Sequence, residues 1–385
     1  MQLLSENPLQ NKQSKLYGLD HLRALAILLV LIYHYGLSCF DQPEWVLTVG
    51  KFGWTGVDLF FVLSGFLISS QLFGQIKSGK QISLREFFLK RFFRILPAFW
   101  VVLLIYFWIP GFHEREGLPP FWKFLTFTQN FGLDIGNHGT FSQVWSLCVE
   151  EHFYLLLPLI LLFLMYAKLF KRSVWLLAGI FLFGFGIRIF NWEHFVLPDQ
   201  GLWYQYIYYP TYNRLDGLLV GVAIAGLVHF RPLIWKRLSG YGNLIILLSL
   251  VVLTGSYFLC YDQHSFMATI LGFPLVSLGY GLIVMGAICP DSFLYRWQSK
   301  STTLIATLSY AIYLTHKGII HVIQLAFKSF NLDTNTNVML VICAIACLFG
   351  ALALNLAVEK PFMKWRDSII SGIQNKKLVA KRELL

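Results

Sequence analysis

Long apolar runs separated by short polar segments fill almost the whole chain. An α-helix needs about 20 predominantly apolar residues to cross a bilayer. The pattern predicts about ten such helices, with boundaries fixed to within several residues, and hence an all-α polytopic membrane protein. The predicted spans lie near 17–40, 52–73, 96–112, 144–166, 174–192, 209–229, 243–260, 266–288, 302–323 and 338–357.

The remaining segments are short, which limits what else the chain holds. Segment 119–131 is aromatic but too short to span, so we expect it to be interfacial or re-entrant. We find no repeat of 20–50 residues and no appended soluble domain. The N-terminus is polar and lacks an evident cleavage site, so no cleavable signal is expected. We therefore predict a single membrane domain over 1–385, with a transmembrane core at about 17–357 and a short basic tail at 358–385.

Composition agrees with this class. The chain is 56% hydrophobic and 13% charged, and its mean hydropathy is +0.60. Such values are typical of polytopic membrane proteins and exclude a soluble core with tails. The six cysteines show no paired CxxC spacing and fall mostly within spans. We interpret them as packing residues, and we expect no disulfide and no metal site.

The positive charges predict the orientation. With the N-terminus inside, 23 of the 31 Lys and Arg residues fall in cytoplasmic segments and 4 in outer segments. The positive-inside rule then makes both termini cytoplasmic. The net charge of +11 is mostly this topological bias. It does not indicate nucleic-acid binding, although the inner basic patches suit anionic membrane lipids or a phosphorylated ligand.

The first span carries three residues that are costly in lipid, namely Asp20, Arg23 and His34. An ionisable side chain inside a membrane is a functional hypothesis by default. Arg23 and His34 are eleven residues apart, about three helical turns, so they share one face at a separation of roughly 16 Å. The alternative is a snorkelling arginine and a hydrogen-bonded packing histidine.

Polar residues of four spans fall at a similar depth. At 1.5 Å rise per residue, each lies roughly 9–11 Å below the outer surface. A common layer is what a buried site needs, because each polar group must find a partner there. These residues are His34, Asp58, Glu150 and His316.

Glu150 begins the sequence Glu150, Glu151, His152 within an apolar helix. Successive helical residues project about 100° apart, so the three cannot face one cavity. We expect one carboxylate to face a site and the other a neighbouring helix.

A second arginine pair lies on the cytoplasmic side. Arg91 and Arg94, at i and i+3, share a helix face at the membrane surface. A planar guanidinium binds phosphate through two parallel hydrogen bonds, so the pair suits a phosphorylated ligand. The simpler alternative is a juxtamembrane anchor for lipid. Together with Arg23, the pair predicts a cationic inner mouth beneath the imidazole–carboxylate layer.

Several stretches together resemble acyltransferase family three, the integral-membrane acyltransferases that O-acylate extracytoplasmic glycans such as lipopolysaccharide O-antigen. The matching stretches are LDHLRALAILLVLIYH, GVDLFFVLSGFLI, KRFFRILP, VWSLCVEEHFYLLLPL, RLDGLLVGV, LSYAIYLTH and VEKP. They cover both ends and most spans between. One departure is His21, where the family often has Gly, beside the inner mouth. The sequence shows no C-terminal hydrolase-like domain of the kind found in longer members, so we expect the stand-alone type.

The resemblance implies an O-acyltransferase that takes its acyl group, expected to be acetyl, from cytoplasmic acyl-CoA. The family's donor-side arginines fall on Arg23, Arg91 and Arg94. Its histidine falls on His34, which would be the general base on the acceptor hydroxyl or would carry the acyl group itself. Its carboxylates fall on Glu150 and Asp58, either of which would orient the imidazole.

The acceptor is expected to be an extracytoplasmic or lipid-linked carbohydrate at a cell membrane, the bacterial inner membrane by resemblance. We expect Arg214, Trp145 and His316 to bind it, with Arg188, Trp203 and Tyr204 near the entrance. Two other classes of protein also carry charged residues within membrane spans. A secondary transporter or exporter is one, although no repeat or broken-helix pair supports it. A non-catalytic sensor or scaffold is the other, but it would not need the face shared by Arg23 and His34.

Overall fold

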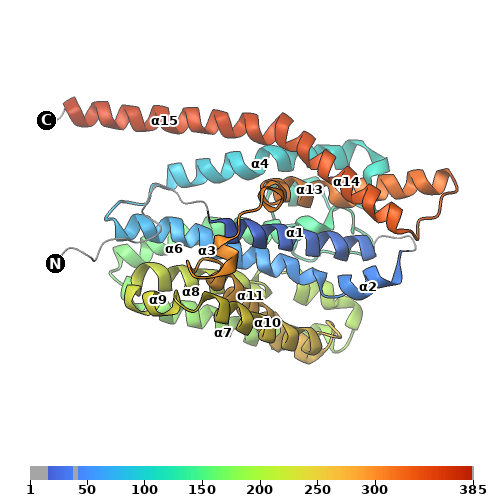
Figure 1. Ribbon diagram of the computed structural model, residues 1–385, viewed down its shortest axis with the longest axis horizontal. Coiled ribbons are helices and arrows are strands. Elements are labelled where there is room, and N and C mark those ends of the chain that lie inside the picture. Colours follow the sequence, from blue (N-terminus) through green and yellow to red (C-terminus); the bar gives the residue numbers. More distant parts are fainter. Residues whose placement is uncertain (1–15, 38–41, 384–385) are drawn as a thin grey trace.

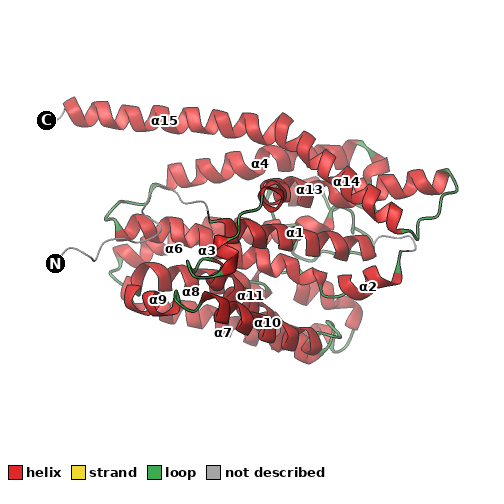
Figure 2. Ribbon diagram, in the orientation of Figure 1, coloured by secondary structure: helices red, strands yellow, loops and turns green. Residues whose placement is uncertain are grey.

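The described residues, 16–37 and 42–383, form helices and connecting turns without a strand in this computed structural model (Figure 2). The expected all-α architecture is therefore confirmed. The α-helices are α1 Tyr17–Leu37, α2 Glu44–Gly50, α3 Gly56–Lys77, α4 Leu84–Trp108, α5 Phe121–Leu125, α6 Trp145–Tyr166, α7 Ser173–Asn191, α8 Asp216–Phe230, α9 Pro232–Leu238, α10 Gly242–Leu259, α11 Phe273–Ala287, α12 Phe293–Arg296, α13 Lys300–Ser329, α14 Asn337–Leu354 and α15 Lys360–Glu383.

The helices confirm a multi-pass membrane protein but not the expected number of ten spans. Among the described residues, seven helices are long and apolar enough to cross a membrane, or eight if the bent pair α8 and α9 counts as one. The expected spans at 96–112 and 302–323 fall in α4 and α13, which are not among these seven. These two helices are 25 and 30 residues long, but they carry the polar residues of the candidate site.

Helix α1 lies at the centre of the bundle, with α3, α8 and α11 on one side and α4, α13 and α14 on the other (Figure 1). The closest contact in the first group is between α3 and α8. A Cβ atom at Gly65 would lie 2.2 Å from the Leu218 carbonyl oxygen, and one at Gly221 would lie 2.4 Å from that of Val62. Small residues let these two backbones meet, as expected for helices that pack inside a membrane.

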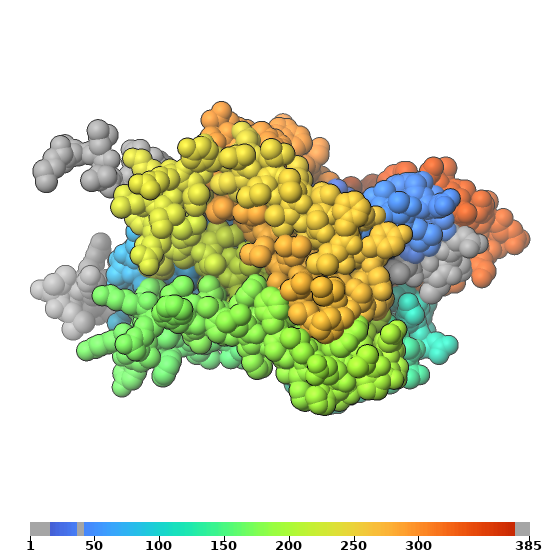
Figure 3. Space-filling model, turned by 90° about the horizontal axis from the view of Figure 1, so that it is seen from below, coloured from blue at the N-terminus to red at the C-terminus, as the bar shows by residue number. Residues whose placement is uncertain are grey.

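Apolar side chains that would face lipid are exposed on several helices, including α7 and α10 on the face seen in Figure 3. On α7, the large apolar side chains of Trp175, Leu182 and Phe183 are exposed. An aqueous protein would bury such side chains, whereas hydrocarbon solvates them. On the face of α7 that packs against other helices, Arg188 is fully buried and pairs with Asp216 at 2.6 Å.

The segment between α4 and α6 folds as a compact loop against the bundle. Its one α-helix is α5, which is five residues long, so segment 119–131 is too short to span a membrane, as expected. Its tip is held locally, because Asp134 accepts hydrogen bonds from the Asn137 amide group at 2.7 Å and from the Gly136 N–H at 2.9 Å. These bonds, that from the Asn137 side chain above all, lower the pKa of the exposed Asp134 carboxyl. The loop is thus ordered enough to shape a cavity.

The helix after the last apolar segment extends away from the bundle. From Asn337 to Ile373 the chain forms one long helical unit, with a π-helical turn at Asn355–Glu359 between α14 and α15. Figure 1 shows α15 running past the ends of its neighbours. The basic tail expected from the sequence is thus helical up to Glu383. Five cysteines in the described residues are free and buried, as expected for packing residues, and Cys39 lies outside those residues.

Candidate active site

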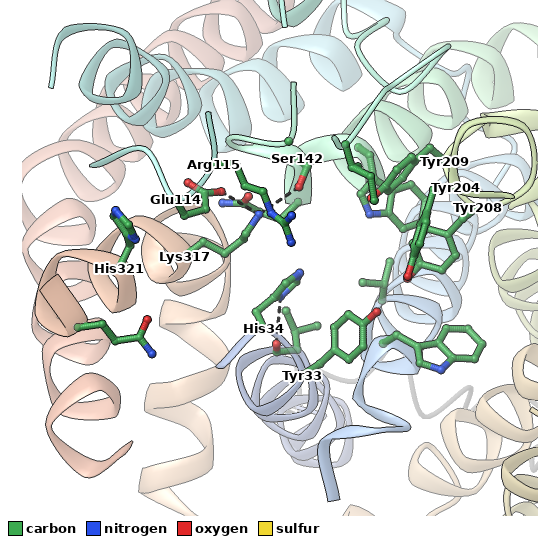
Figure 4. A pocket seen from close by; sticks show the side chains of 18 residues that line it. Tyr33, His34, Glu114, Arg115, Ser142, Tyr204, Tyr208, Tyr209, Lys317 and His321 are labelled. Atoms are coloured by element: carbon green, nitrogen blue, oxygen red, sulfur yellow. Dashed lines mark hydrogen bonds and ion pairs between the residues drawn. The ribbon is translucent and has the colours of Figure 1, made fainter. Parts of the chain in front are cut away.

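Two of the cavities beside α1 lie at its two candidate functional residues. The first, about 150 Å³ in volume, is lined by His34 and by the loop between α4 and α6 (Figure 4). We call it the histidine cavity. The second, about 340 Å³, is lined by Arg23, Arg91, Arg94 and Glu150, and we call it the arginine cavity. One helix therefore contributes an imidazole to one cavity and a guanidinium to the other.

The hydrogen bonds of two histidines determine where their protons lie. His316 Nδ1 is 3.1 Å from the Ile312 carbonyl oxygen and 2.9 Å from that of Tyr313, so this nitrogen must be the donor. A neutral His316 then has its lone pair on Nε2, which lies 3.0 Å from His34 Nδ1. His34 Nδ1 is also 3.1 Å from the Val30 carbonyl oxygen, another acceptor.

His34 Nδ1 must therefore carry the proton, and Nε2 carries the lone pair. That tautomer is the one a general base needs at Nε2. The role of orienting His34, expected of a carboxylate, thus falls in this structure to the imidazole of His316. The sequence placed His316 in the same layer but expected it to bind the acceptor.

Asp58 and Arg214 form a buried ion pair. Arg214 NH2 donates to both carboxylate oxygens of Asp58, at 2.9 and 3.0 Å, and its guanidinium lies 4.0 Å from the centre of the Phe273 ring. Arg214 is 1% exposed, so it is not placed to meet an acceptor directly. The pair instead supports the cavity wall, because the guanidinium lies 5.4 Å from the ring of Trp145, which lines the histidine cavity as expected.

Glu150 faces the arginine cavity. Its Oε2 accepts a hydrogen bond from Ser64 Oγ at 3.0 Å and another from the Tyr154 hydroxyl. Ser64 is thus a hydrogen-bond donor within the bundle. His152, two residues after Glu150, bonds through Nδ1 to Thr211 Oγ1 at 2.8 Å. Glu150 and His152 therefore have different surroundings, as their angular spacing predicts.

The arginine cavity has a surplus of positive charge. Three guanidinium groups line it, whereas Glu150 is the one carboxylate among its described lining residues. A second carboxylate lies nearby, since Glu359 Oε2 is 3.9 Å from Arg94 NH1. His21, the departure from the family pattern, faces elsewhere and is 2.8 Å from Thr302 Oγ1 through Nδ1. The expected cationic mouth is thus present without His21.

The histidine cavity also holds a polar cluster that the sequence pattern did not predict. Lys317 Nζ lies 2.8 Å from Glu114 Oε1 and donates to Ser142 Oγ at 3.0 Å, as the dashed lines in Figure 4 show. Glu114 Oε1 also accepts from the Phe141 N–H at 3.0 Å. The signal available in the sequence was Lys317 itself, a charged residue next to His316 in an apolar helix. Its partners come from a loop that no periodicity aligns with α13.

One tyrosine separates the two cavities. Tyr313 lines the arginine cavity, and its hydroxyl bonds to Ser146 Oγ at 2.6 Å and to the Gln143 carbonyl oxygen. Gln143 lines the histidine cavity, whereas Ser146 lines the arginine cavity. The start of α6 and this phenol therefore stand between the imidazole pair and the guanidinium groups.

Known proteins resemble the chain over most of its length. A family model described as an acyltransferase domain matches residues 16–356. An O-acetyltransferase OatA from Staphylococcus aureus is 29% identical over 323 residues, which is 79% of this chain and 50% of that protein. The peptidoglycan O-acetyltransferase OatA of Listeria monocytogenes has the same identity over 79% of this chain and 49% of its own.

A putative O-acetyltransferase of Staphylococcus aureus is 27% identical over 384 residues, covering 92% of this chain and 59% of its own. The chain thus spans half to three fifths of the length of these relatives. No solved structure matches it. The family expected from the sequence motifs is confirmed by the family model.

Proposed function

The chain belongs to the acyltransferase-domain family, and from this premise we propose that it moves an acyl group, acetyl in the first instance, from cytoplasmic acyl-CoA to a hydroxyl of an extracytoplasmic or lipid-linked glycan. The observation that carries the proposal is the pairing of the two cavities along α1. A cationic cavity suits an anionic donor, and a cavity with an oriented imidazole suits proton transfer from a hydroxyl.

On the donor side, Arg91 and Arg94 bind the phosphates of CoA and Arg23 guides its pantetheine arm toward α6. Surplus positive charge in the arginine cavity supports this assignment. Glu150 holds the tyrosine and serine side chains that form the cavity wall. The thioester carbonyl must then reach the histidine cavity past Tyr313.

On the acceptor side, His34 Nε2 takes the proton of the acceptor hydroxyl while its oxygen attacks the thioester carbonyl carbon. The C–S bond breaks, the new C–O ester bond remains on the acceptor, and the thiolate of CoA leaves and is protonated. His316 accepts the hydrogen bond of His34 Nδ1–H, so Nε2 presents the lone pair when the acceptor hydroxyl arrives.

The acceptor is a carbohydrate. The relative from Listeria monocytogenes supports this, since it is named a peptidoglycan O-acetyltransferase. Three tyrosines of the histidine cavity, Tyr204, Tyr208 and Tyr209, suit the apolar face of a sugar ring. Because the relatives come from bacteria, we propose the cytoplasmic membrane of a bacterium as the location.

The test is transfer by the full-length protein in liposomes, with isotopically labelled acetyl-CoA as donor and peptidoglycan glycan strands as acceptor. Mass spectrometry should detect ester-linked label on the glycan that depends on both protein and donor. Unlabelled acetyl ester formed on the glycan without added acetyl-CoA would contradict the donor assignment. A transporter would instead move solute across the vesicle without forming an ester.

The second test concerns orientation, which decides which cavity meets the cytoplasm. Reporter fusions after Lys51 and Glu193 should read outside, and one after Lys171 should read inside. The reason is that the positive residues concentrate in the segments on the same side of the membrane as the N-terminus. The opposite readings would place the histidine cavity at the cytoplasmic face and remove the donor assignment.

A further inference from the structure

Arg115 is a cation of the histidine cavity that has no ion-pair partner among the described residues. It lies in the loop between α4 and α6, and Figure 4 shows its guanidinium directed into the cavity, on the side opposite Tyr33. A positive residue is unusual in this loop, because the outer segments hold only 4 of the 31 Lys and Arg residues. One of these four thus faces the cavity that contains the candidate base.

The loop fixes the position of Arg115. The buried Thr140 donates through Oγ1 to the Arg115 carbonyl oxygen at 2.6 Å, and the Thr140 N–H donates to the Gly117 carbonyl oxygen at 3.0 Å. Gly139 leaves room for the arginine side chain, because a Cβ atom there would lie 3.0 Å from Arg115 Cδ. Backbone and aliphatic stem are thus both restrained, so the guanidinium would lose little freedom on binding a ligand.

The neighbouring charges leave Arg115 available. Glu114 is the one carboxylate among the described lining residues of this cavity, and it is already bound by Lys317 and by the Phe141 N–H. Lys317 and Glu114 cancel each other, so the charge of Arg115 is a surplus of one unit facing the acceptor space. A ligand anion is the partner that would balance it.

We propose that Arg115 binds an anionic oxygen group of the acceptor, a sugar carboxylate or a sugar-linked phosphate, and so makes the enzyme selective for acidic glycans. The inference rests on the proposed acyl transfer to a glycan and adds the charge of that glycan. Carboxylate and phosphate present the same paired oxygens to a guanidinium. The tyrosines of the opposite wall contact the sugar ring, while Arg115 binds its charged substituent.

The test uses the full-length protein in liposomes with acetyl-CoA and one disaccharide acceptor in three forms: carboxylate, carboxamide, and phosphate monoester in place of the carboxylate. The KM of an anionic form should be about 10- to 100-fold below that of the carboxamide, as expected for a charge-assisted hydrogen-bonded pair. A difference in KM between the carboxylate and the phosphate forms identifies which of the two anionic groups the site binds better.

Variants test whether Arg115 causes the preference for anionic acceptors. Arg115→Gln should abolish it by raising the KM of the anionic forms, with the donor KM unchanged, and Arg115→Lys should retain part of it. Lys123→Gln removes the same charge from the same outer segment away from the cavity and should leave the preference intact. Membrane abundance of each variant controls for folding. The comparison of the three acceptors with the wild-type protein tests the inference even if a variant fails to fold.

Equal KM values for the carboxylate and carboxamide forms would overturn the inference while leaving acyl transfer to glycans in place. A fall in kcat that is equal for all three acceptors in Arg115→Gln would overturn it too, since Arg115 would then act on the reacting carbonyl. Absence of transfer to any acceptor would remove the proposed function, and this inference with it.

Discussion

The arginine cavity and the histidine cavity lie on the same central helix but differ in how their charges are balanced. In the arginine cavity, three guanidinium groups meet Glu150, with Glu359 3.9 Å from Arg94. The smaller histidine cavity is lined by His34, whose imidazole shares one hydrogen bond with the buried imidazole of His316. Unbalanced charge attracts an ionic ligand, whereas paired neutral imidazoles hold a proton at a defined atom. The difference assigns binding to one cavity and chemistry to the other.

The largest expected effect concerns the chemistry. His34→Asn keeps a polar side chain of similar size but cannot accept a proton at neutral pH. Loss of a general base costs about 10²–10⁴ in rate. We expect near-normal membrane abundance and transfer reduced by that factor, measured as ester formation per folded molecule in the same membranes.

His321→Asn is the matched control, because His321 lines the same cavity on α13. It should leave the rate far closer to that of the wild type. Substantial activity per folded molecule in His34→Asn would remove the assignment of the base and, with it, the division of labour between the cavities.

The next effect concerns stability. Asp58 pairs with Arg214, and the guanidinium of Arg214 lies against Trp145 in the wall of the histidine cavity. Asp58→Asn would leave Arg214 charged and without its carboxylate partner in a buried position. Breaking one side of a buried ion pair costs about 3–5 kcal/mol. We expect a marked fall in folded protein, measured by membrane abundance and thermal melting in detergent.

Asp134→Asn is the control, since that exposed carboxylate bonds only within its own loop. It should leave abundance near that of the wild type. If Asp58→Asn folded normally but lost transfer, Asp58 would have the catalytic role that the motif resemblance implies.

Helical periodicity predicted the features that lie along a single helix. Arg23 and His34 share α1, and Arg91 and Arg94 share α4, so their spacing alone indicated which pairs face one region. The all-α membrane class followed from apolar length, which is a local property of the chain. These predictions needed no knowledge of how the helices are arranged.

Contacts between helices were not predictable in the same way. A common depth placed Asp58, Glu150 and His316 near His34, but depth does not give the rotation of a helix about its axis. In the structure that rotation directs Asp58 to Arg214 and Glu150 to the arginine cavity, and it leaves His316 beside His34. The loop ligands of Lys317 could not be predicted either, because loops have no period.

A smaller effect is expected at the orienting residue. His316→Leu removes the acceptor that fixes the proton on His34 Nδ1, although the Val30 carbonyl oxygen remains. By analogy with residues that orient metal-bound histidines, the loss should be about 10- to 100-fold in kcat, with a small change in acceptor KM.

His316→Gln offers a sharper comparison, because its side-chain oxygen still accepts a hydrogen bond. It should recover part of the rate that His316→Leu loses, and pH–rate profiles of both variants should be compared with that of the wild type. A loss that appeared as a raised acceptor KM instead would return His316 to the acceptor-binding role expected from the sequence.

The smallest expected effect concerns binding in the arginine cavity. Arg91→Lys and Arg94→Lys, combined, keep both positive charges but lose the planar fork that holds a phosphate through two hydrogen bonds. The donor KM should rise by about tenfold, the order expected for one lost charge-assisted hydrogen bond, while kcat at saturating acetyl-CoA changes little. Arg85→Lys is the matched control, since Arg85 lies on the same helix but is exposed and does not line the cavity. Initial rates against acetyl-CoA concentration, at a fixed saturating acceptor, measure the effect. An unchanged donor KM in the double variant would identify the pair as a lipid anchor, and the surplus charge of this cavity would then need a ligand other than CoA.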